Sequence, residues 1–324
     1  MSPRYPVLLL PCLLICLLVA QGAHAAGRII SVTVLHDGLK RTALVRVPPQ
    51  VDAQRLLPVV LNFHGGGGNA VSQERYARMD ALADREGFIV AYPNGTGVLQ
   101  ESLLTWNAGT CCGAAVRNAV DDVGFVRALL DELGRRLPVD ATRVYATGLS
   151  NGAMMSYRLA AELSDRIAAI APVAGASAMP RFHAKRMVPI LHVHSVDDPR
   201  ALYKGGLGPP FPFTNVRVMH QSVEEVLSKW AAFGGCNPKA VLRDERHGAA
   251  GTPSAEHTAK LYVYTGCRDG TEVALWQLTG AGHVWPGGEP NFLQRLLGPG
   301  TDVIDANEEI WRFFRRYHLP PARQ

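Results

Sequence analysis

The chain has 324 residues, a formal net charge of +5 and a hydrophobic fraction of 47%. The length is enough for about two domains, but open α/β folds commonly reach this size as one unit. The positive charge is mild and spread along the sequence, so nothing indicates a nucleic-acid partner. The sequence has no internal repeats and no low-complexity linkers or tails, so we do not expect an attached polymer-binding module.

The N-terminus is typical of a secretory signal peptide. Arg4 precedes an apolar run over 7–20, which is followed by the small-x-small sequence Ala23-His24-Ala25. The run is shorter than the ~20 apolar residues that a membrane-spanning helix needs, and no later segment is typical of one. We therefore predict a signal peptide at 1–25 and a mature chain with no stable membrane anchor. Its predicted location is extracellular or periplasmic.

Strand and helix patterns alternate along the mature chain. Two apolar runs flank Asp37-Gly38, which is a hairpin signal. Predicted strands then lie at 57–63, 88–92, 144–147, 167–173 and 188–194, and predicted helices at 70–85, 122–136 and 154–163. This alternation predicts an α/β fold with a mostly parallel sheet and helices on both faces, entered through an antiparallel hairpin. The layout is that of an α/β-hydrolase, and we expect one catalytic domain over 26–324.

The segment Gly148-Leu149-Ser150-Asn151-Gly152 lies between a predicted strand and a predicted helix. This context is that of a nucleophile elbow, although a purely structural turn is the alternative. The chain must turn sharply there, and a side chain at Gly148 or Gly152 would collide across the turn. The turn exposes the Ser150 hydroxyl and directs the Asn151 amide at a developing oxyanion. We predict Ser150 as the nucleophile and Asn151 as one oxyanion-hole donor.

The second oxyanion donor is expected in the glycine run Gly65-Gly66-Gly67-Gly68, which follows the predicted strand at 57–63. A backbone amide needs no side chain, and we favour Gly66 while its neighbours remain open. His64 precedes the run. A histidine at this position more often shapes the loop through hydrogen bonds than serves as the catalytic base.

His283 is the candidate base. It lies in a glycine-flanked loop before the last predicted helix, after both Ser150 and the acid candidates. This satisfies the chain order serine, acid, histidine, and a neutral imidazole can take the serine proton. The neighbouring Trp285 is a candidate substrate contact, with packing on the loop as the alternative.

The acid is expected just past the strand at 188–194, where Asp197 and Asp198 are adjacent. Only one can orient the imidazole, because consecutive side chains in an extended loop point apart. His192 and His194 share one face of that strand. They suggest a metal pair, but no third ligand is apparent, so we favour strand packing and predict no metal site.

Removal of the signal peptide leaves four cysteines in an oxidising compartment, and four cysteines allow three pairings. Cys236 follows a predicted helix and Cys267 ends a strand-like run, so these two can join as a loop staple. Cys111 and Cys112 then form a vicinal ring or remain thiols. Metal binding is disfavoured, because the sequence has no C-x-x-C spacing.

Several motifs, in the same order, resemble the secreted polyhydroxybutyrate depolymerase and feruloyl esterase family. They are His64-Gly65-Gly66, Trp106-Asn107-Ala108-Gly109, Cys111-Cys112-Gly113, Asp121-Asp122-Val123-Gly124-Phe125, the segment 148–154, Asp198-Pro199 with Tyr203 and Gly205-Gly206, and Gly282-His283-Val284-Trp285-Pro286-Gly287. The resemblance covers nearly all of the mature chain.

In that family the acid falls in a His-Gly-Thr-x-Asp-Pro segment, so the resemblance implies that Asp198 is the acid and Asp197 occupies the variable position. This chain differs in having Ser195-Val196 where the family has Gly-Thr. The resemblance also implies an extracellular serine esterase that needs no cofactor, with Trp106 as a candidate substrate contact.

These observations favour hydrolysis of a carboxylic ester by Ser150, His283 and Asp198, with the amides of Asn151 and Gly66 as oxyanion donors. The candidate substrates are hydroxyalkanoate oligomers or polymers and feruloyl or acetyl esters of polysaccharides. The alternatives are acyl transfer or peptide hydrolysis on the same triad, and a secreted binding protein that keeps the hydrolase fold. Fold alone does not choose among them.

Overall fold

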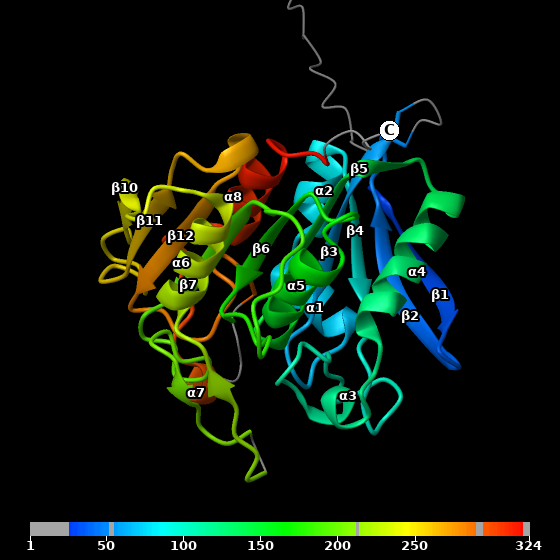
Figure 1. Ribbon diagram of the computed structural model, residues 1–324, viewed down its shortest axis with the longest axis horizontal. Coiled ribbons are helices and arrows are strands. Elements are labelled where there is room, and N and C mark those ends of the chain that lie inside the picture. The colour runs from blue at the N-terminus through cyan, green and yellow to red at the C-terminus, as the bar shows by residue number, and fades with distance from the viewer. Residues whose placement is uncertain (1–25, 52–54, 212–213, 290–293, 320–324) are drawn as a thin grey trace, which may run out of the picture.

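The computed structural model describes residues 26–51, 55–211, 214–289 and 294–319, so the predicted signal peptide lies outside the described residues. Ten of the described strands form one sheet in the order β1-β2-β4-β3-β5-β6-β7-β12-β11-β10 (Figure 1). They are β1 (Arg28–His36), β2 (Leu39–Val47), β3 (Leu57–Phe63), β4 (Ile89–Pro93), β5 (Val139–Leu149), β6 (Ala169–Val173), β7 (Ile190–Ser195), β10 (Val241–His247), β11 (Thr258–Tyr264) and β12 (Val273–Thr279). A separate pair consists of β8 (Gly206–Leu207) and β9 (Met219–His220).

The centre of the sheet is parallel and both of its edges are antiparallel. Strands β4, β3, β5, β6, β7 and β12 run in one direction, as the alternating pattern predicted. The predicted hairpin joins β1 to β2, and Asp37 and Gly38 adopt positive φ angles of 49° and 73° in its turn. At the second antiparallel edge, β11 coincides with the strand-like run before Cys267. Its partner β10 was not predicted, because β10 is largely exposed and carries charged side chains instead of an apolar pattern.

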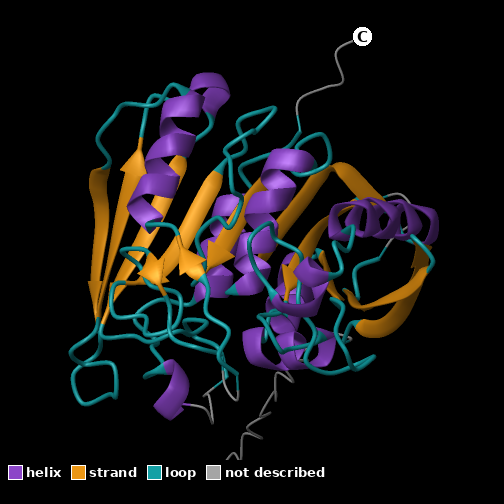
Figure 2. Cartoon of the chain, turned by 60° about the horizontal axis from the view of Figure 1, so that its bottom comes forward, coloured by secondary structure: helices purple, strands orange, loops and turns teal. Residues whose placement is uncertain are grey.

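Helices cover both faces of the sheet (Figure 2). One face carries α4 (Asp122–Arg136), α5 (Asn151–Glu162) and α6 (Val223–Gly234), and the other carries α1 (Ala70–Ala77), α2 (Asp80–Glu86) and α8 (Ala306–Phe314). The short helices α3 (Gly113–Arg117) and α7 (Gln294–Leu297) and a 3₁₀ turn (Arg268–Gly270) lie in the connections. None of the described helices is long and apolar enough to cross a membrane.

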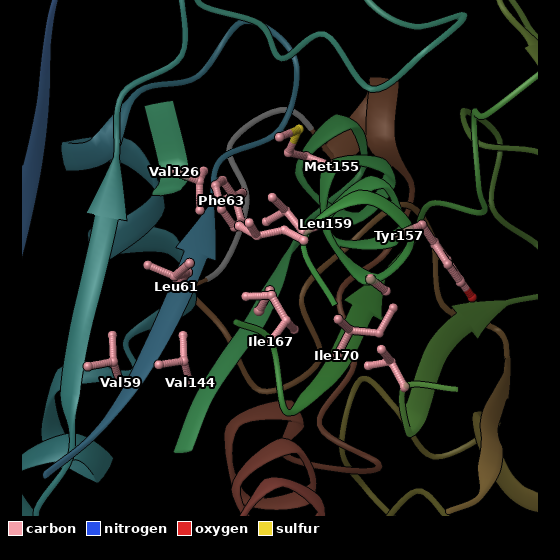
Figure 3. Packing of buried hydrophobic residues seen from close by; sticks show 14 of the residues in the cluster. Val59, Leu61, Phe63, Val126, Val144, Met155, Tyr157, Leu159, Ile167 and Ile170 are labelled. Atoms are coloured by element: carbon pink, nitrogen blue, oxygen red, sulfur yellow. The ribbon is translucent and has the colours of Figure 1, made fainter. Parts of the chain in front are cut away.

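The strands divide their side chains between two cores, one on each face. In β3 every residue is buried, and Leu57, Val59, Leu61 and Phe63 belong to the cluster with α4, α5 and α6. Val60 points to the opposite cluster with α1, α2 and α8. This is the alternation expected of a strand buried on both sides. Figure 3 shows side chains of β3, β5 and α5 in the first cluster.

The single helix predicted over 70–85 is wrong, because the chain forms two helices there. Arg78 has a left-handed φ of 55° and ends α1, and its N–H donates to the carbonyl of Glu74 at 3.0 Å. The change of direction allows Met79, with 1% of its surface exposed, to enter the core beside α2. Helical periodicity does not reveal a break of this kind when the apolar pattern continues on both sides of it.

The predicted disulfide between Cys236 and Cys267 is present. It joins the end of α6 to the segment that follows β11. Cys111 and Cys112 are also paired as a vicinal disulfide, which is one of the two states that the sequence left open.

Candidate active site

The predicted catalytic residues meet at the carboxyl edge of the parallel strands. Ser150 follows β5, Asp198 lies beyond β7, and His283 lies beyond β12. The glycine run 65–68 follows β3 at the same edge. In Figure 1 this edge is at the bottom, where the segments that carry β8, β9 and α7 gather. Open parallel sheets place their ligand sites there.

The turn at Ser150 has the geometry of a nucleophile elbow. Ser150 adopts φ 57° and ψ −115°, a conformation that costs energy for a residue with a side chain. A Cβ atom at Gly148 would lie 2.6 Å from the carbonyl oxygen of Phe63 on the neighbouring β3, and one at Gly152 would collide with the same oxygen. The two glycines therefore allow the turn to press against β3, while α5 begins directly at Asn151.

His283 and Asp198 form a buried pair. His283 Nδ1 lies 2.7 Å from Asp198 Oδ2, and the two side chains are 7% and 0% exposed. The other oxygen, Asp198 Oδ1, accepts hydrogen bonds from the backbone N–H groups of Arg200 (2.7 Å) and Ala201 (2.9 Å). Burial alone would raise the pKa of the Asp198 carboxyl. The charge of His283 and the hydrogen bonds from His194 and His283 outweigh burial and hold that pKa well below its usual range.

Asp197 points elsewhere, although it is adjacent. Its side chain is exposed, and its Oδ2 accepts a hydrogen bond from the Gly280 N–H at 2.7 Å. Gly280 lies at the start of the loop that carries His283. Asp197 thus contacts the backbone of the histidine loop, whereas Asp198 contacts the imidazole itself.

A chain of buried side chains leads to the Asp198 carboxylate from α5. The Tyr157 hydroxyl lies 3.0 Å from His192 Nδ1, and His192 Nε2 lies 2.9 Å from His194 Nδ1. His194 Nε2 lies 2.8 Å from the carbonyl oxygen of Ala201 and 3.2 Å from Asp198 Oδ2. Both of these oxygens accept only, so Nε2 of His194 carries a proton. When His194 Nδ1 accepts from His192 Nε2, the Tyr157 hydroxyl donates to His192 Nδ1, and His194 Nε2 donates to Asp198 at the other end.

Burial supports the neutral state at the inner end of this chain. It is the main reason why the pKa of His192 is held well below its usual range, with His194 adding to the effect. The strand face that the sequence assigned to packing therefore carries hydrogen bonds as well. No group of three or more His, Cys, Asp or Glu side chains within the described ranges is arranged to hold a metal ion.

Ser150 and His283 line one cavity of about 220 Å³, which we call the active-site pocket. Gly65, Gly66 and Asn151 also line it, and its apolar wall includes Leu149, Met154, Phe211 and Val218. A second hollow of about 510 Å³ shares Gly65 and Gly66 with this pocket and extends past Asn69, Val71 and Tyr76.

Two of the four backbone N–H groups in the glycine run 65–68 already donate hydrogen bonds within the protein. The Gly67 N–H donates to the carbonyl of Leu104 at 2.8 Å, and the Gly68 N–H donates to that of Gly65 at 3.0 Å. Neither the Gly65 nor the Gly66 N–H has an acceptor among the described residues. Gly65 and Gly66 line the active-site pocket, and the sequence had favoured Gly66.

His64 shapes this loop. His64 Nδ1 lies 2.8 Å from the carbonyl oxygen of Gly65, and its Nε2 accepts the Gly95 N–H at 3.0 Å. Burial lowers the pKa of His64 to about 4, so the ring is neutral at neutral pH. Both ring nitrogens are occupied by backbone groups, as expected of a structural histidine.

The structure corrects the prediction that Trp106 and Trp285 contact the substrate. Trp106 is fully buried and its Nε1–H donates to the carbonyl of His64 at 3.0 Å, while Trp285 is 2% exposed and its Nε1–H donates to Asn307 at 3.1 Å. Neither lines the active-site pocket. Aromatic side chains beside catalytic motifs are typical of substrate contacts, but here both indoles and their single polar atoms are used in packing.

The Asn151 side chain connects the elbow to the segment around Trp106. Asn151 Oδ1 accepts the Trp106 N–H at 2.7 Å, and its Nδ2 donates to the Trp106 carbonyl at 3.1 Å. The segment continues to Cys111 and Cys112, which line the active-site pocket. The sequence assigned a role only to the backbone amide of Asn151, as an oxyanion-hole donor. In the structure the side chain has a second role, because it holds the segment around Trp106.

Two polar residues of the pocket were missed altogether. Arg200 and His220 line it, and neither lies in a pattern that the sequence could connect to Ser150. His220 is on β9. This strand becomes part of the pocket only because the segment between β7 and α6 folds back over the carboxyl edge of the parallel strands.

Comparisons with known proteins identify the family of the chain. Residues 42–232 match the family model described as "Esterase PHB depolymerase". The chain belongs to this family. Its members are carboxylic ester hydrolases, and the chain is a carboxylic ester hydrolase of that family.

Two curated relatives illustrate the match. A putative esterase, NocK, from Nocardia uniformis subsp. tsuyamanensis is 31% identical over 254 residues, which are 74% of this chain and 69% of that protein. Feruloyl esterase B from Piromyces equi is 29% identical over 258 residues, 75% of this chain. The chain spans only 42% of the length of the Piromyces protein.

Solved structures confirm the α/β-hydrolase fold. An acetyl xylan esterase from Aspergillus awamori superposes with a TM-score of 0.54 at 17% identity, over 80% of this chain and 94% of that one. A thermostable esterase gives a TM-score of 0.51 at 16% identity, over 90% of this chain and 63% of that one.

Proposed function

We propose that the chain is a secreted serine esterase in which Ser150, His283 and Asp198 form the catalytic triad. The observation that carries the proposal is the buried hydrogen bond between His283 and Asp198 beside the pocket that Ser150 also lines. A carboxylate on Nδ1 fixes the tautomer in which Nε2 is free to take a proton. The N-terminal pattern over 1–25 supports secretion.

The reaction proceeds through an acyl-enzyme. Ser150 Oγ attacks the ester carbonyl while His283 Nε2 takes the hydroxyl proton, and the amides of Asn151 and Gly66 stabilise the oxyanion. The tetrahedral intermediate collapses, and His283 returns the proton to the departing alcohol. Water then repeats the sequence, with His283 as its base, and releases the acid and free Ser150.

The substrate is an ester that extends to both sides of Ser150. The active-site pocket and the second hollow adjoin at Gly65 and Gly66, so the acyl and alcohol parts of an ester have separate spaces. The names of the relatives include feruloyl and acetyl xylan esterases. Feruloyl or acetyl esters of polysaccharides and hydroxyalkanoate oligomers or polymers are the classes we propose.

A panel of esters assayed with matched variants tests this function. The panel comprises 4-nitrophenyl acetate and butyrate, methyl ferulate, acetylated xylan and 3-hydroxybutyrate oligomers. Ser150→Ala and His283→Ala should each lower turnover by about 10⁴-fold or more, because triad residues act as a unit. Ser228→Ala, which removes an exposed hydroxyl on α6, is the control and should retain full activity. Near-normal turnover by folded Ser150→Ala would exclude the serine mechanism.

A further inference from the structure

The lining of the active-site pocket includes one arginine, Arg200, which has no acidic partner among the described residues. Arg200 is half-buried and lines the pocket that holds Ser150 and His283. Its Nη2 donates to the carbonyl of Pro210 at 3.0 Å, and its guanidinium forms no ion pair within the described part of the chain. Asp198 is the acid that influences it, but the Asp198 oxygens already accept from His283, His194 and two backbone amides.

His220 is a second polar residue of this lining. It lines the pocket, and its ring nitrogens have no hydrogen-bond partner among the described residues. Burial is the largest influence on its pKa, which is lowered to about 4, so the ring is neutral at neutral pH. A Cβ atom at Gly208 would lie 2.7 Å from His220 Nε2 and 3.2 Å from the Arg200 carbonyl oxygen. The glycine therefore lets the His220 ring pack closely against this segment, next to the backbone of Arg200.

The rest of this pocket makes an unpaired cation notable. Leu149, Met154, Phe211 and Val218 give it an apolar lining. A charged group in such surroundings loses hydration, and the loss is offset when a ligand of opposite charge binds. A guanidinium matches the two oxygens of a carboxylate, and a neutral imidazole adds one further donor or acceptor.

We propose that Arg200, assisted by His220, binds a carboxylate carried by the ester substrate, so that the enzyme prefers anionic esters to neutral esters of the same shape. This inference rests on the proposed function, because it assigns a substrate class to the pocket in which Ser150 acts. The carboxylate belongs to the part of the ester that occupies the active-site pocket. Arg200 is a specificity residue in this scheme and takes no part in the proton transfers.

Two pairs of matched esters test the preference. The first pair, 4-acetoxybenzoate and 4-acetoxybenzamide, places the carboxylate or its neutral amide on the alcohol side. The second pair, the 4-nitrophenyl esters of 4-carboxybenzoic and 4-carbamoylbenzoic acid, places it on the acyl side. The para arrangement prevents the carboxylate from attacking its own ester. The quantity measured is the ratio of kcat/KM for the anionic ester to kcat/KM for its amide.

The wild-type ratio should exceed unity by about tenfold or more in one pair, which is the size expected of a charge-assisted hydrogen bond. Arg200→Gln should abolish that preference mainly through KM, and Arg200→Lys should retain part of it. Arg217→Gln removes an exposed charge from the same segment and should leave the ratio unchanged. A wild-type ratio near one in both pairs, or a ratio that survives Arg200→Gln, would overturn the proposal.

Failure of the proposed function gives a different result. It would appear as no hydrolysis of any of the four esters, together with an inactive ester panel. Hydrolysis of the amide-bearing esters that depends on Ser150 keeps the esterase function in place, whatever the ratio is.

Discussion

At the scale of single residues, the two adjacent aspartates show how the backbone separates similar side chains. Asp198 is buried with both oxygens occupied, and one of them contacts the imidazole of His283. Asp197 is exposed, and its carboxylate accepts a hydrogen bond from a backbone N–H, that of Gly280, at the start of the loop that carries His283. An amide oxygen at position 197 still accepts that bond, whereas an amide at position 198 loses the charge that stabilises an imidazolium.

We predict that Asp198→Asn lowers kcat by about 10³- to 10⁴-fold, because the imidazole loses its carboxylate partner. Asp197→Asn, which makes the same chemical change one residue earlier, should retain kcat within about twofold, since surface substitutions of this kind have small effects. Steady-state kinetics on 4-nitrophenyl butyrate, with circular dichroism as a check of folding, decides between them. The reverse order would assign the acid to Asp197.

How much of the site the sequence reveals depends on the kind of information each residue carries. The placement of Ser150 and His283 beside one pocket could be predicted, because the glycines around them and their order along the chain are those that the turn and the proposed reaction require. Periodicity alone did not separate Asp197 from Asp198. Arg200 and His220 could not be predicted, since their place in the pocket depends on how the β8–β9 segment folds over the sheet.

At the scale of elements, the junction of α1 and α2 partly buries the carboxyl group of Asp80, which disfavours its charged form. Asp80 begins α2 with its side chain 18% exposed, and the Tyr92 hydroxyl donates to its Oδ1 at 2.7 Å. Burial is the main cause that raises the pKa of Asp80 to about 6, against the opposing hydrogen bond from Tyr92. Asp84 lies one turn later. There burial is the largest single influence, but the hydrogen bonds from Arg46 and from the Gly27 N–H, together with the charge of Arg46, outweigh it and lower the pKa of Asp84.

This difference predicts a pH dependence of stability. The folded-state pKa of Asp80 exceeds the unfolded value of about 3.9, so its contribution is fully present below pH ~4 and is lost as the pH rises through about 6. Asp80→Asn should therefore gain about 1 to 2 kcal/mol in unfolding free energy relative to wild type between pH 5 and pH 8. Urea unfolding at the two pH values measures this gain.

Asp84→Asn is the matched control in the same helix. The pKa of Asp84 is depressed in the folded state, so its contribution is present above the unfolded pKa and is lost only as the pH falls toward the acid range. Its difference from wild type should be equal at pH 5 and pH 8. An equal difference for Asp80→Asn as well would show that its carboxyl titrates normally.

At the scale of the whole molecule, the sheet brings together residues that are far apart in the chain. His283 and Asp198 are separated by 85 positions, yet they form one hydrogen bond because β7 and β12 are parallel neighbours. The alternation of strands and helices predicts that the residues following parallel strands meet at one edge of the sheet. The exposed edge strand β10 and the break after α1 were not predictable in the same way. In both places local conformation follows from contacts that no short pattern encodes.

The chain belongs to a family of carboxylic ester hydrolases, and in the proposed mechanism Ser150 carries the acyl group during turnover. A fluorophosphonate ester modifies an activated serine nucleophile, and mass spectrometry of the labelled peptides locates the residue that it has modified. We expect one adduct per chain, on Ser150, with a proportional loss of ester hydrolysis and no labelling of Ser150→Ala. An adduct on a different residue that accompanies complete inactivation, with Ser150 unmodified, would show that Ser150 is not the nucleophile.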